Sequence, residues 1–204
     1  MTVSNFGIGC VVLAAGESSR LGRPKALIDI MGEPLISWIT GRLVKLGFAP
    51  VIVTRMEIYD AIKNSVGDVD VVINQHPELG RTGTVKEGLK FINDKYGEGL
   101  DILIVPVDRP GFSLSTVELL ISKEDSTCPT YGGKGGHPLL VSKQDCNKIM
   151  MARSDAPLNG VISPRRMPVN DKYLHFNLDT KKDVDEFLMV VKFLRESDTH
   201  REAT

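Results

Sequence analysis

The sequence has little cysteine and no long apolar run, and both absences exclude classes of protein. Its 204 residues include three cysteines, Cys10, Cys128 and Cys146, which are widely spaced and form no C-x-x-C pair. This spacing indicates neither a disulfide framework nor a zinc cluster, and it favours reduced thiols. No apolar run approaches the length of a membrane span, and the N-terminus lacks a signal-peptide pattern. We therefore expect a cytoplasmic protein with no membrane partner.

An excess of one charge sign is also missing. The chain carries 25 basic and 26 acidic residues, a formal net charge of -1. Such a balance provides no basic coat for nucleic acid and no polybasic block for a membrane surface. Any anion that the protein binds must therefore be met by locally placed cations.

Apolar runs and helical periodicities alternate through the first 120 residues. Short continuous apolar runs predict strands within 9–16, 49–55, 68–75 and 100–108. Apolar residues at helical spacing predict helices over 36–46, 57–66, 84–96, 115–122 and 145–153. Further on, residues 128–143 hold a glycine-rich turn between two strand-like pieces, and residues 175–194 begin as a strand and continue as a long amphipathic helix.

This alternation predicts an α/β fold with one open, mostly parallel, doubly wound, Rossmann-like sheet. We expect a single domain over residues 1–204, with flexible ends at about 1–6 and 196–204. Ligands of such sheets bind beyond the carboxyl ends of the strands. Three polar clusters fall at predicted strand ends: the loop after Leu13, Asp108, and the stretch from Asn177 to Asp179.

The loop after the first strand is rich in small and cationic residues. The small residues are Ala14, Ala15, Gly16, Ser18 and Ser19, and the cations are Arg20 and Lys25. Small residues let a ligand approach the backbone N–H groups, and arginine binds two phosphate oxygens at once. The loop is therefore typical of a polyphosphate cradle. It is not a P-loop, because it does not end in Gly-Lys-Ser/Thr, and it lacks the GxGxxG of dinucleotide-binding folds.

The string LAAGESSRLGRPKAL, residues 13–27, resembles the signature of the MobA-like NTP transferase family. Its LAAG, Ser-Ser-Arg and Arg-Pro-Lys are similar to the molybdenum cofactor cytidylyltransferase branch. Further stretches resemble family motifs in order, at 32–35, 71–89, 105–113, 132–141 and 176–187. The chain departs from the family pattern at 81–84, where Arg-Thr-Gly-Thr replaces the usual hydroxyl residues, and at Asn177, where the cytidylyl branch usually has Asp.

The resemblance implies a Mg²⁺-dependent nucleotidyl transfer from an NTP, CTP or GTP, with release of pyrophosphate. It implies catalytic roles for Arg20, Lys25 and Asp108. The implied nucleotide-binding residues are Leu13, Ala14, Ala15, Gly16, Ser18, Ser19, Arg20, Lys25, Asn74, Gly80 and Thr84. The metal candidates are Asp108, Asp179 and Asn177. From the residues alone, Asp108 can instead tie down a turn and Asp179 can cap a helix.

On the acceptor side, the resemblance implies Lys134, Gly136 and His137, with molybdopterin as the phosphate-bearing acceptor and a molybdoenzyme as a partner protein. Arg109, Arg165 and Arg166 are either solvated surface residues or, for the last two, contacts of a pterin phosphate. LAAG and the Gly-His-Pro motif favour CTP over GTP.

Two other interpretations stay open. In the first, the chemistry is the same but the substrates differ: a guanylyltransferase acting on molybdopterin or a corrinoid phosphate, or a sugar-phosphate nucleotidyltransferase. In the second, the chain is a non-catalytic protein that binds a nucleotide or the finished cofactor. Arg20, Lys25 and Asp108 together favour an enzyme over this second interpretation.

Overall fold

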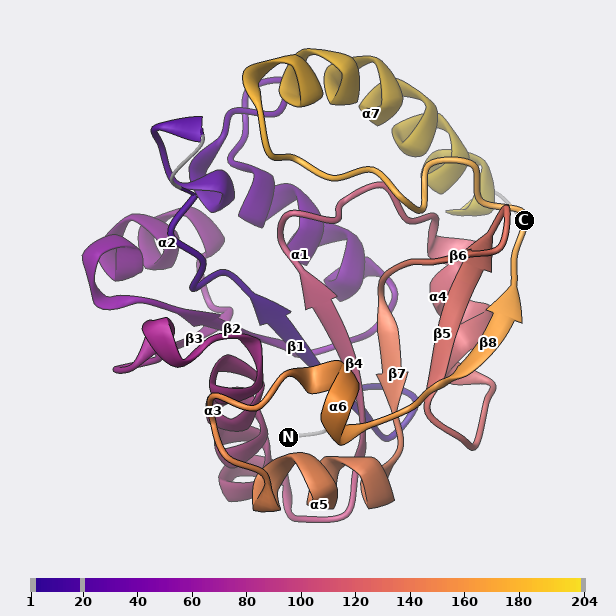
Figure 1. Ribbon diagram of the computed structural model, residues 1–204. Coiled ribbons are helices and arrows are strands. Elements are labelled where there is room, and N and C mark those ends of the chain that lie inside the picture. Colours follow the sequence, from indigo (N-terminus) through magenta and orange to yellow (C-terminus); the bar gives the residue numbers. More distant parts are fainter. Residues whose placement is uncertain (1–2, 19–20, 203–204) are drawn as a thin grey trace.

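The core of the molecule is an eight-stranded sheet with the strand order β3-β2-β1-β4-β7-β5-β6, and β8 is added beside β5 (Figure 1). The computed structural model describes residues 3–18 and 21–202, and the side chains as far as residue 198. The first half of the sheet comprises β1 (Ile8–Leu13), β2 (Pro50–Thr54), β3 (Asp70–Ile73) and β4 (Asp101–Pro106). All neighbouring pairs in this half are parallel.

The second half of the sheet is mixed. It comprises β5 (Thr127–Tyr131), β6 (Lys134–Gly135), β7 (Leu139–Val141) and β8 (Arg165–Pro168). β7 runs antiparallel to both β4 and β5, β6 is antiparallel to β5, and β8 is parallel to β5. The second half therefore continues the sheet with a change of strand direction, at the border between β4 and β7.

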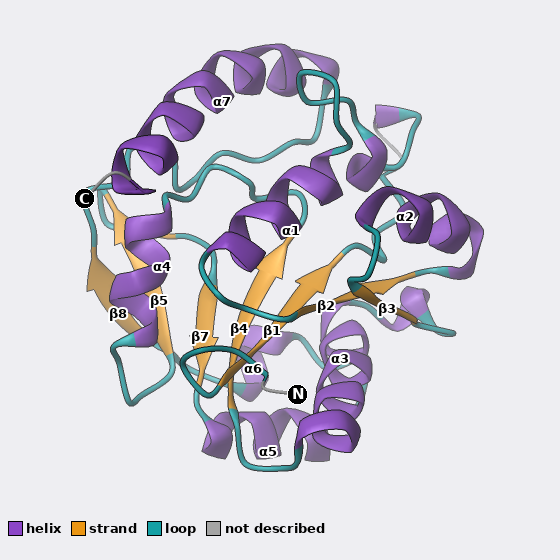
Figure 2. Ribbon diagram, turned by 180° about the vertical axis from the view of Figure 1, so that it is seen from behind, coloured by secondary structure: helices purple, strands orange, loops and turns teal. Residues whose placement is uncertain are grey.

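Helices cover both faces of the sheet (Figures 1 and 2). One face carries α1 (Leu35–Lys45), α2 (Tyr59–Val66), α4 (Leu114–Ile121) and α7 (Lys181–Glu202); the other carries α3 (Arg81–Tyr96), α5 (Lys143–Met151) and α6 (Leu158–Val161). Successive residues of a strand point to opposite faces. Accordingly, Cys10 and Val12 join the core under α1 and α7, and Val11 and Leu13 join the core under α3 and α5.

The predicted α/β class and the mostly parallel doubly wound sheet are confirmed. The four early strands and the glycine-rich turn between β5 and β7 also lie where the sequence predicts them. Helix α3 begins at Arg81, three residues before the expected start at 84. Within residues 3–18 and 21–202, no helix is both long and apolar enough to cross a bilayer.

Two local features differ from what the sequence predicts. Residues 175–179 form no strand, because this segment is held by single contacts, such as the Leu178 N–H bond to the Asp108 carbonyl, and not by a ladder. The strand β8 is not predicted, because its Arg-Arg-Met-Pro sequence has no apolar alternation. Helix α7 continues to Glu202, and the Asp198 carboxylate accepts a hydrogen bond from Arg42. Flexibility of the ends at about 1–6 and 196–204 stays a prediction.

The segment 171–178 joins the two halves of the sheet through close backbone packing. A Cβ added to Gly111 would overlap the carbonyl oxygen of Tyr173, and one added to Gly136 would overlap Leu174. Only glycine allows these two approaches. Asp171 completes the attachment, since its Oδ2 accepts hydrogen bonds from the Ser113 N–H and the Thr116 hydroxyl, both at 2.8 Å. The segment thereby carries Asn177 and Asp179 to the carboxyl end of β4.

Candidate functional site

A cleft of about 260 Å³ opens beyond the carboxyl ends of β1 and β4. It is the place where a doubly wound sheet is expected to bind a ligand. The residues that line it are Leu13, Ala14, Ala15, Gly16, Ser18, Lys25, Ala26, Ile58, Pro77, Gly80, Arg81, Thr84, Pro106, Val107 and Asp108. The structure therefore brings most of the predicted nucleotide-binding residues to one cavity.

The loop after β1 forms one wall of this cleft. Ser18 adopts φ 57° and its Oγ accepts a hydrogen bond from the Lys25 backbone N–H at 3.1 Å, so this serine closes the loop. A Cβ added to Gly16 would meet no described atom within 4 Å, so the backbone here faces open space. The predicted contacts of Ser19 and Arg20 lie outside the described residues. The Ala14 N–H is already bonded to the Val53 carbonyl, at 2.8 Å.

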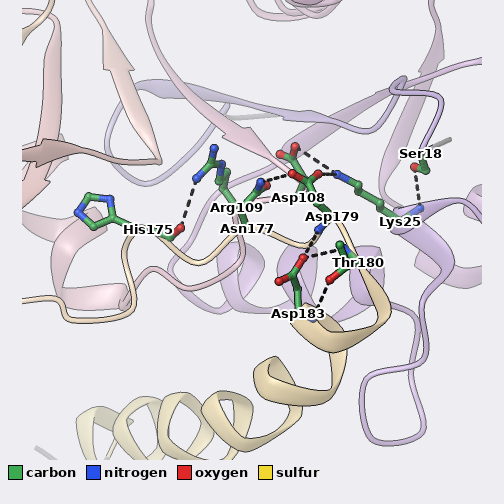
Figure 3. Close-up of polar contacts among 9 residues, drawn as sticks. All are labelled: Ser18, Lys25, Asp108, Arg109, His175, Asn177, Asp179, Thr180 and Asp183. Atoms are coloured by element: carbon green, nitrogen blue, oxygen red, sulfur yellow. Dashed lines mark hydrogen bonds and ion pairs between the residues drawn. The ribbon is translucent and has the colours of Figure 1, made fainter. Parts of the chain in front are cut away.

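Lys25 lies between two carboxylates at the floor of the cleft (Figure 3). Its Nζ is 2.6 Å from Asp179 Oδ1 and 3.7 Å from Asp108 Oδ2. The lysine side chain is 14% exposed, and those of Asp108 and Asp179 are 28% and 27% exposed. Partial burial strengthens the attraction between these charges relative to a solvated pair. One cation and two anions leave one negative charge uncompensated within this group.

A capping box positions Asp179 at the start of α7 (Figure 3). Asp183 Oδ2 accepts hydrogen bonds from the Asp179 N–H at 2.9 Å and the Thr180 N–H at 2.7 Å, and the Asp183 N–H bonds back to Thr180 Oγ1 at 3.3 Å. Burial opposes ionisation of Asp183, but these hydrogen bonds outweigh it and lower the pKa of the carboxyl. The T-x-x-D pattern at 180–183 is a sequence signal for this box.

The oxygen atoms around Lys25 fit a hard divalent cation. Asp108 and Asp179 supply carboxylates, and the buried Asn177 Oδ1 accepts no hydrogen bond, while its Nδ2 donates to Asp179. Mg²⁺ and Mn²⁺ prefer such oxygen ligands, and Mg²⁺ typically uses one or two carboxylates together with phosphate oxygens and water. In the described part of the chain, no group of three or more His, Cys, Asp or Glu side chains could hold a metal. These side chains therefore suit a cation that is held partly by the protein and partly by phosphate oxygens, and not a cation held by protein ligands alone.

Asn74 and Thr84 form a buried pair behind the cleft wall. Asn74 Nδ2 donates to Thr84 Oγ1 at 3.1 Å, and the Thr84 hydroxyl in turn donates to the Gly80 carbonyl at 3.1 Å. Asn74 Oδ1 accepts the His76 N–H at 2.9 Å. Thr84 and Gly80 line the cleft, whereas Asn74 does not and is 4% exposed. Asn74 thus supports the 76–80 loop from behind.

A second cavity, of about 430 Å³, lies next to the first under the glycine-rich loop of β6 and β7. Its lining is Arg81, Cys128, Gly135, Gly136, His137, Leu139, Leu158, Asn159, Ile162, Ser163, Pro164 and Arg166. Burial is the main cause that lowers the pKa of His137, to about 3, and the positive charges of Arg81 and Arg109 add to it. Its imidazole is therefore neutral at physiological pH.

The structure separates the remaining acceptor-side candidates. Gly136 and His137 line the second cavity, and Lys134 is exposed on β6 and does not. Arg166 lines the cavity and donates to the Gly133 carbonyl at 3.1 Å, whereas Arg165 pairs with Asp125 at the exposed sheet edge. Arg109 is half-buried and is not a solvated surface residue.

Sequence reasoning missed several residues of the first cleft. Ile58 and Pro77 come from two short 3-10 turns, Met56–Ile58 and Pro77–Leu79, that no periodicity marks. Arg81 was noted only as a departure from a family pattern. Its position directly after Gly80, in a segment that resembles a family motif, is the signal that could have identified it.

Comparisons with known proteins agree with this geometry. The family described as MobA-like NTP transferase domain matches residues 10–169. A molybdenum cofactor guanylyltransferase from Xanthomonas euvesicatoria is 31% identical over 121 residues, which are 59% of this chain and 57% of that protein. The chain thus matches little more than half the length of this curated relative, and about a quarter of the bifunctional protein GlmU of Staphylococcus epidermidis, which is 24% identical over 57% of this chain.

Among solved structures, Rv0371c from Mycobacterium tuberculosis superposes with a TM-score of 0.75 at 23% identity, covering 89% of this chain and 98% of the other. The same mycobacterial protein has been solved as a complex with manganese. Molybdopterin-guanine dinucleotide biosynthesis protein A from Archaeoglobus fulgidus gives a TM-score of 0.69 at 17% identity, covering 90% and 98%. At these identities the likeness establishes a nucleotidyltransferase fold. The family match covers most of the chain, which therefore belongs to the MobA-like NTP transferase family.

Proposed function

We propose that this nucleotidyltransferase moves a nucleoside monophosphate from an NTP to a phosphate-bearing small molecule, with Mg²⁺ as its cofactor and pyrophosphate as the leaving product. The observation that carries the proposal is the position of Lys25. Its ammonium lies between Asp108 and Asp179 at the floor of a cleft whose wall is the small-residue loop after β1. A cation beside two oxygen-rich metal ligands is the arrangement that a metal-bound triphosphate requires.

Each part of the site has a task in this reaction. The loop at residues 15–18 can meet the β- and γ-phosphates with its backbone N–H groups. Lys25 contacts the α-phosphate and stabilises the negative charge that grows there in the transition state. Asp108 and Asp179, with Asn177, would hold a divalent cation, which supplies charge neutralisation of the phosphates when bound. Arg20 remains a further candidate for the leaving pyrophosphate. No covalent intermediate is needed, so the reaction calls for no nucleophilic side chain.

We propose CTP as the nucleotide and molybdopterin as the acceptor. LAAG at 13–16 and Gly-His-Pro at 136–138 support the cytidylyl assignment through the resemblance. GTP is the second candidate, because a relative of 31% identity is a molybdenum cofactor guanylyltransferase. The second cavity supports a compact acceptor with an apolar body, since Leu139, Leu158 and Ile162 line it. A molybdoenzyme partner and a cytoplasmic location stay predictions.

Nucleotide-dependent thermal stabilisation tests the proposal. The purified chain is heated with CTP, GTP, ATP or UTP, each with and without Mg²⁺, because a ligand that binds only the native state raises the melting temperature. We expect the largest Mg²⁺-dependent increase with CTP and little increase for Lys25→Gln. Lys182→Gln, which removes an exposed charge on α7, serves as the matched control. A larger increase with GTP would transfer the assignment to guanylyl transfer, and no increase with any nucleotide would contradict the proposal.

Turnover separates an enzyme from a binding protein. Pyrophosphate release is followed with molybdopterin and the preferred nucleotide, and a corrinoid phosphate and a sugar 1-phosphate are the competing acceptors. We expect release with molybdopterin only. Release with either competitor would correct the acceptor, and tight nucleotide binding without release from any acceptor would favour the non-catalytic interpretation.

A further inference from the structure

Two arginines act through their charges on the imidazole of His137, and one of them, Arg81, lies where the two cavities meet. Arg81, the first residue of α3, lines both the nucleotide cleft and the second cavity. Arg109 directly follows Asp108, which lines the nucleotide cleft, and its Nη1 donates to the His175 carbonyl at 3.3 Å (Figure 3). Arg81 comes from the start of α3 and Arg109 from the turn after β4.

Neither arginine has an acidic partner in the described part of the chain. Other arginines of the molecule do: Arg42 pairs with Asp198, Arg153 with Asp155 and Arg165 with Asp125. Arginines gathered without counter-charges repel one another, and the repulsion is relieved when an anion binds between them. A planar guanidinium is also the side chain best suited to grip a phosphate through two parallel hydrogen bonds.

His137 provides an independent sign of a ligand at this place. Its Nδ1 is buried and has no hydrogen-bond partner, although buried polar atoms are nearly always satisfied. The charges of both Arg81 and Arg109 act on this imidazole, so both guanidinium groups lie near it. His137 also lines the second cavity. An unsatisfied polar atom beside two unpaired cations indicates a site for a polar, anionic group.

We propose that Arg81 and Arg109 bind the phosphomonoester of the acceptor and hold it against the nucleotide, with His137 at its side. In the reaction, an oxygen of this phosphate forms a bond to the α-phosphorus of the NTP. The bond from the α-phosphorus to the oxygen that bridges it to the β-phosphorus breaks, and its electron pair leaves with pyrophosphate. The role given to the anion rests on the proposed nucleotidyl transfer, whereas its binding at the junction does not.

The geometry favours the acceptor over the triphosphate as the ligand of this pair. The triphosphate already has Lys25 and the loop after β1, on the other wall of the cleft. Arg109 lines neither cavity, but its charge acts on His137, which lines the second cavity and not the nucleotide cleft. Lys134 does not line the second cavity, so this proposal moves the acceptor phosphate from Lys134 to the arginine pair.

Phosphate titration tests the pair without any acceptor. Backbone amide NMR spectra of the ¹⁵N-labelled full chain are recorded with increasing inorganic phosphate, at constant ionic strength and neutral pH. We expect saturable shifts at the amides of Arg109, Gly111, Gly136 and His137. Removing one guanidinium removes charge-assisted hydrogen bonds, so Arg81→Gln and Arg109→Gln should each weaken phosphate binding about tenfold. Lys90→Gln, which removes one positive charge from an exposed site on the same helix as Arg81, should stay within about twofold.

The same titration is repeated with the nucleotide cleft filled by a CTP analogue with an α,β-methylene bridge and Mg²⁺. Phosphate should still bind at the junction, and Arg109→Gln should change analogue affinity by no more than about twofold. Unchanged phosphate affinity in both arginine variants, or shifts confined to residues 14–18, would overturn the inference. Failure of the analogue to bind would contradict the proposed function and leave the phosphate shifts as they are. Arg81 is exposed, so its variant decides the matter if Arg109→Gln does not fold.

Discussion

The two halves of this sheet serve the candidate site in different ways. The half built on β1 to β4 is parallel, and its strands end together at the nucleotide cleft. The half built on β5 to β8 changes strand direction, is assembled from short pieces, and carries the second cavity. The first half presents backbone and Lys25 to a ligand, and the second presents apolar side chains with Arg166 and His137.

This difference indicates which half of the sheet is expected to set the specificity for the substrate. A triphosphate is common to many substrates, and its recognition by backbone N–H groups and one lysine needs a fixed loop at the end of a buried strand. An acceptor differs from enzyme to enzyme, and the short strands and loops of the second half tolerate changes of side chain. Variants in each half can show whether the two halves act separately or through the segment 171–178 that joins them.

The largest expected effect is on Lys25. Lys25→Gln removes the charge proposed to stabilise the transition state, so we expect the rate of nucleotidyl transfer to fall by about 10²–10³-fold. Pyrophosphate release measures it. Lys182→Gln should keep the wild-type rate, because the Lys182 side chain is 83% exposed and forms an ion pair with Glu186 on the outer face of α7. A loss of less than tenfold in Lys25→Gln would show that the first half does not carry the chemistry.

The junction between the halves is tested at Gly111. Gly111→Ala places a methyl group against the Tyr173 carbonyl, so we expect the free energy of unfolding to fall by about 1–3 kcal/mol. Urea denaturation measures it. Gly160→Ala is the control, because a Cβ there meets no described atom within 4 Å. Equal stability of the two variants would mean that the close approach of segment 171–178 is not needed.

Metal binding is the next test. Asp108→Asn removes one of the two carboxylates around Lys25 and should raise the dissociation constant of Mn²⁺, in the presence of nucleotide, by about tenfold or more. Electron paramagnetic resonance of free Mn²⁺ reads the affinity directly. Asp155→Asn, at an exposed ion pair with Arg153, should not change it. An unchanged dissociation constant of Mn²⁺ in Asp108→Asn would mean that Asp108 only stabilises the turn after β4.

The last test concerns His137 and the pH dependence of stability. Its pKa is about 3 in the folded chain and near 6.5 when unfolded, so the unfolded state binds more protons between these values. The contribution of the neutral, buried His137 to the free energy of unfolding is therefore fully present above about pH 6.5. It is lost as the pH falls toward 3, by up to about 1.4 kcal/mol per pH unit. His137→Gln should flatten this slope in urea denaturation at pH 5 and 7. The exposed His76→Gln should not, and equal slopes would contradict the burial of His137 as a neutral group.

Much of the first half could be predicted from the sequence. The run at 9–16 is apolar without interruption and ends in small residues, so strand, loop and phosphate cradle follow from local chemistry. Asp108 could be selected as a site residue because it ends a recognisable strand, and Asp179 because it precedes a recognisable helix. The second half could not be predicted as well, because β8 has two arginines and a proline and, among the described residues, pairs with β5 alone. Nothing local indicates such an edge strand.

The sequence is sufficient to predict the class of fold, the loop after β1 and the family to which the signature belongs, since each of these depends on neighbouring residues. The position of Lys25 between Asp108 and Asp179 is visible in the tertiary structure alone. These three residues are far apart in the chain, so the distances between their side chains depend on how the elements pack. The tertiary structure also places Asn74 behind the wall of the cleft and Arg81 in the lining of both cavities. Local patterns fix which elements form, whereas the meeting of distant side chains depends on how those elements pack.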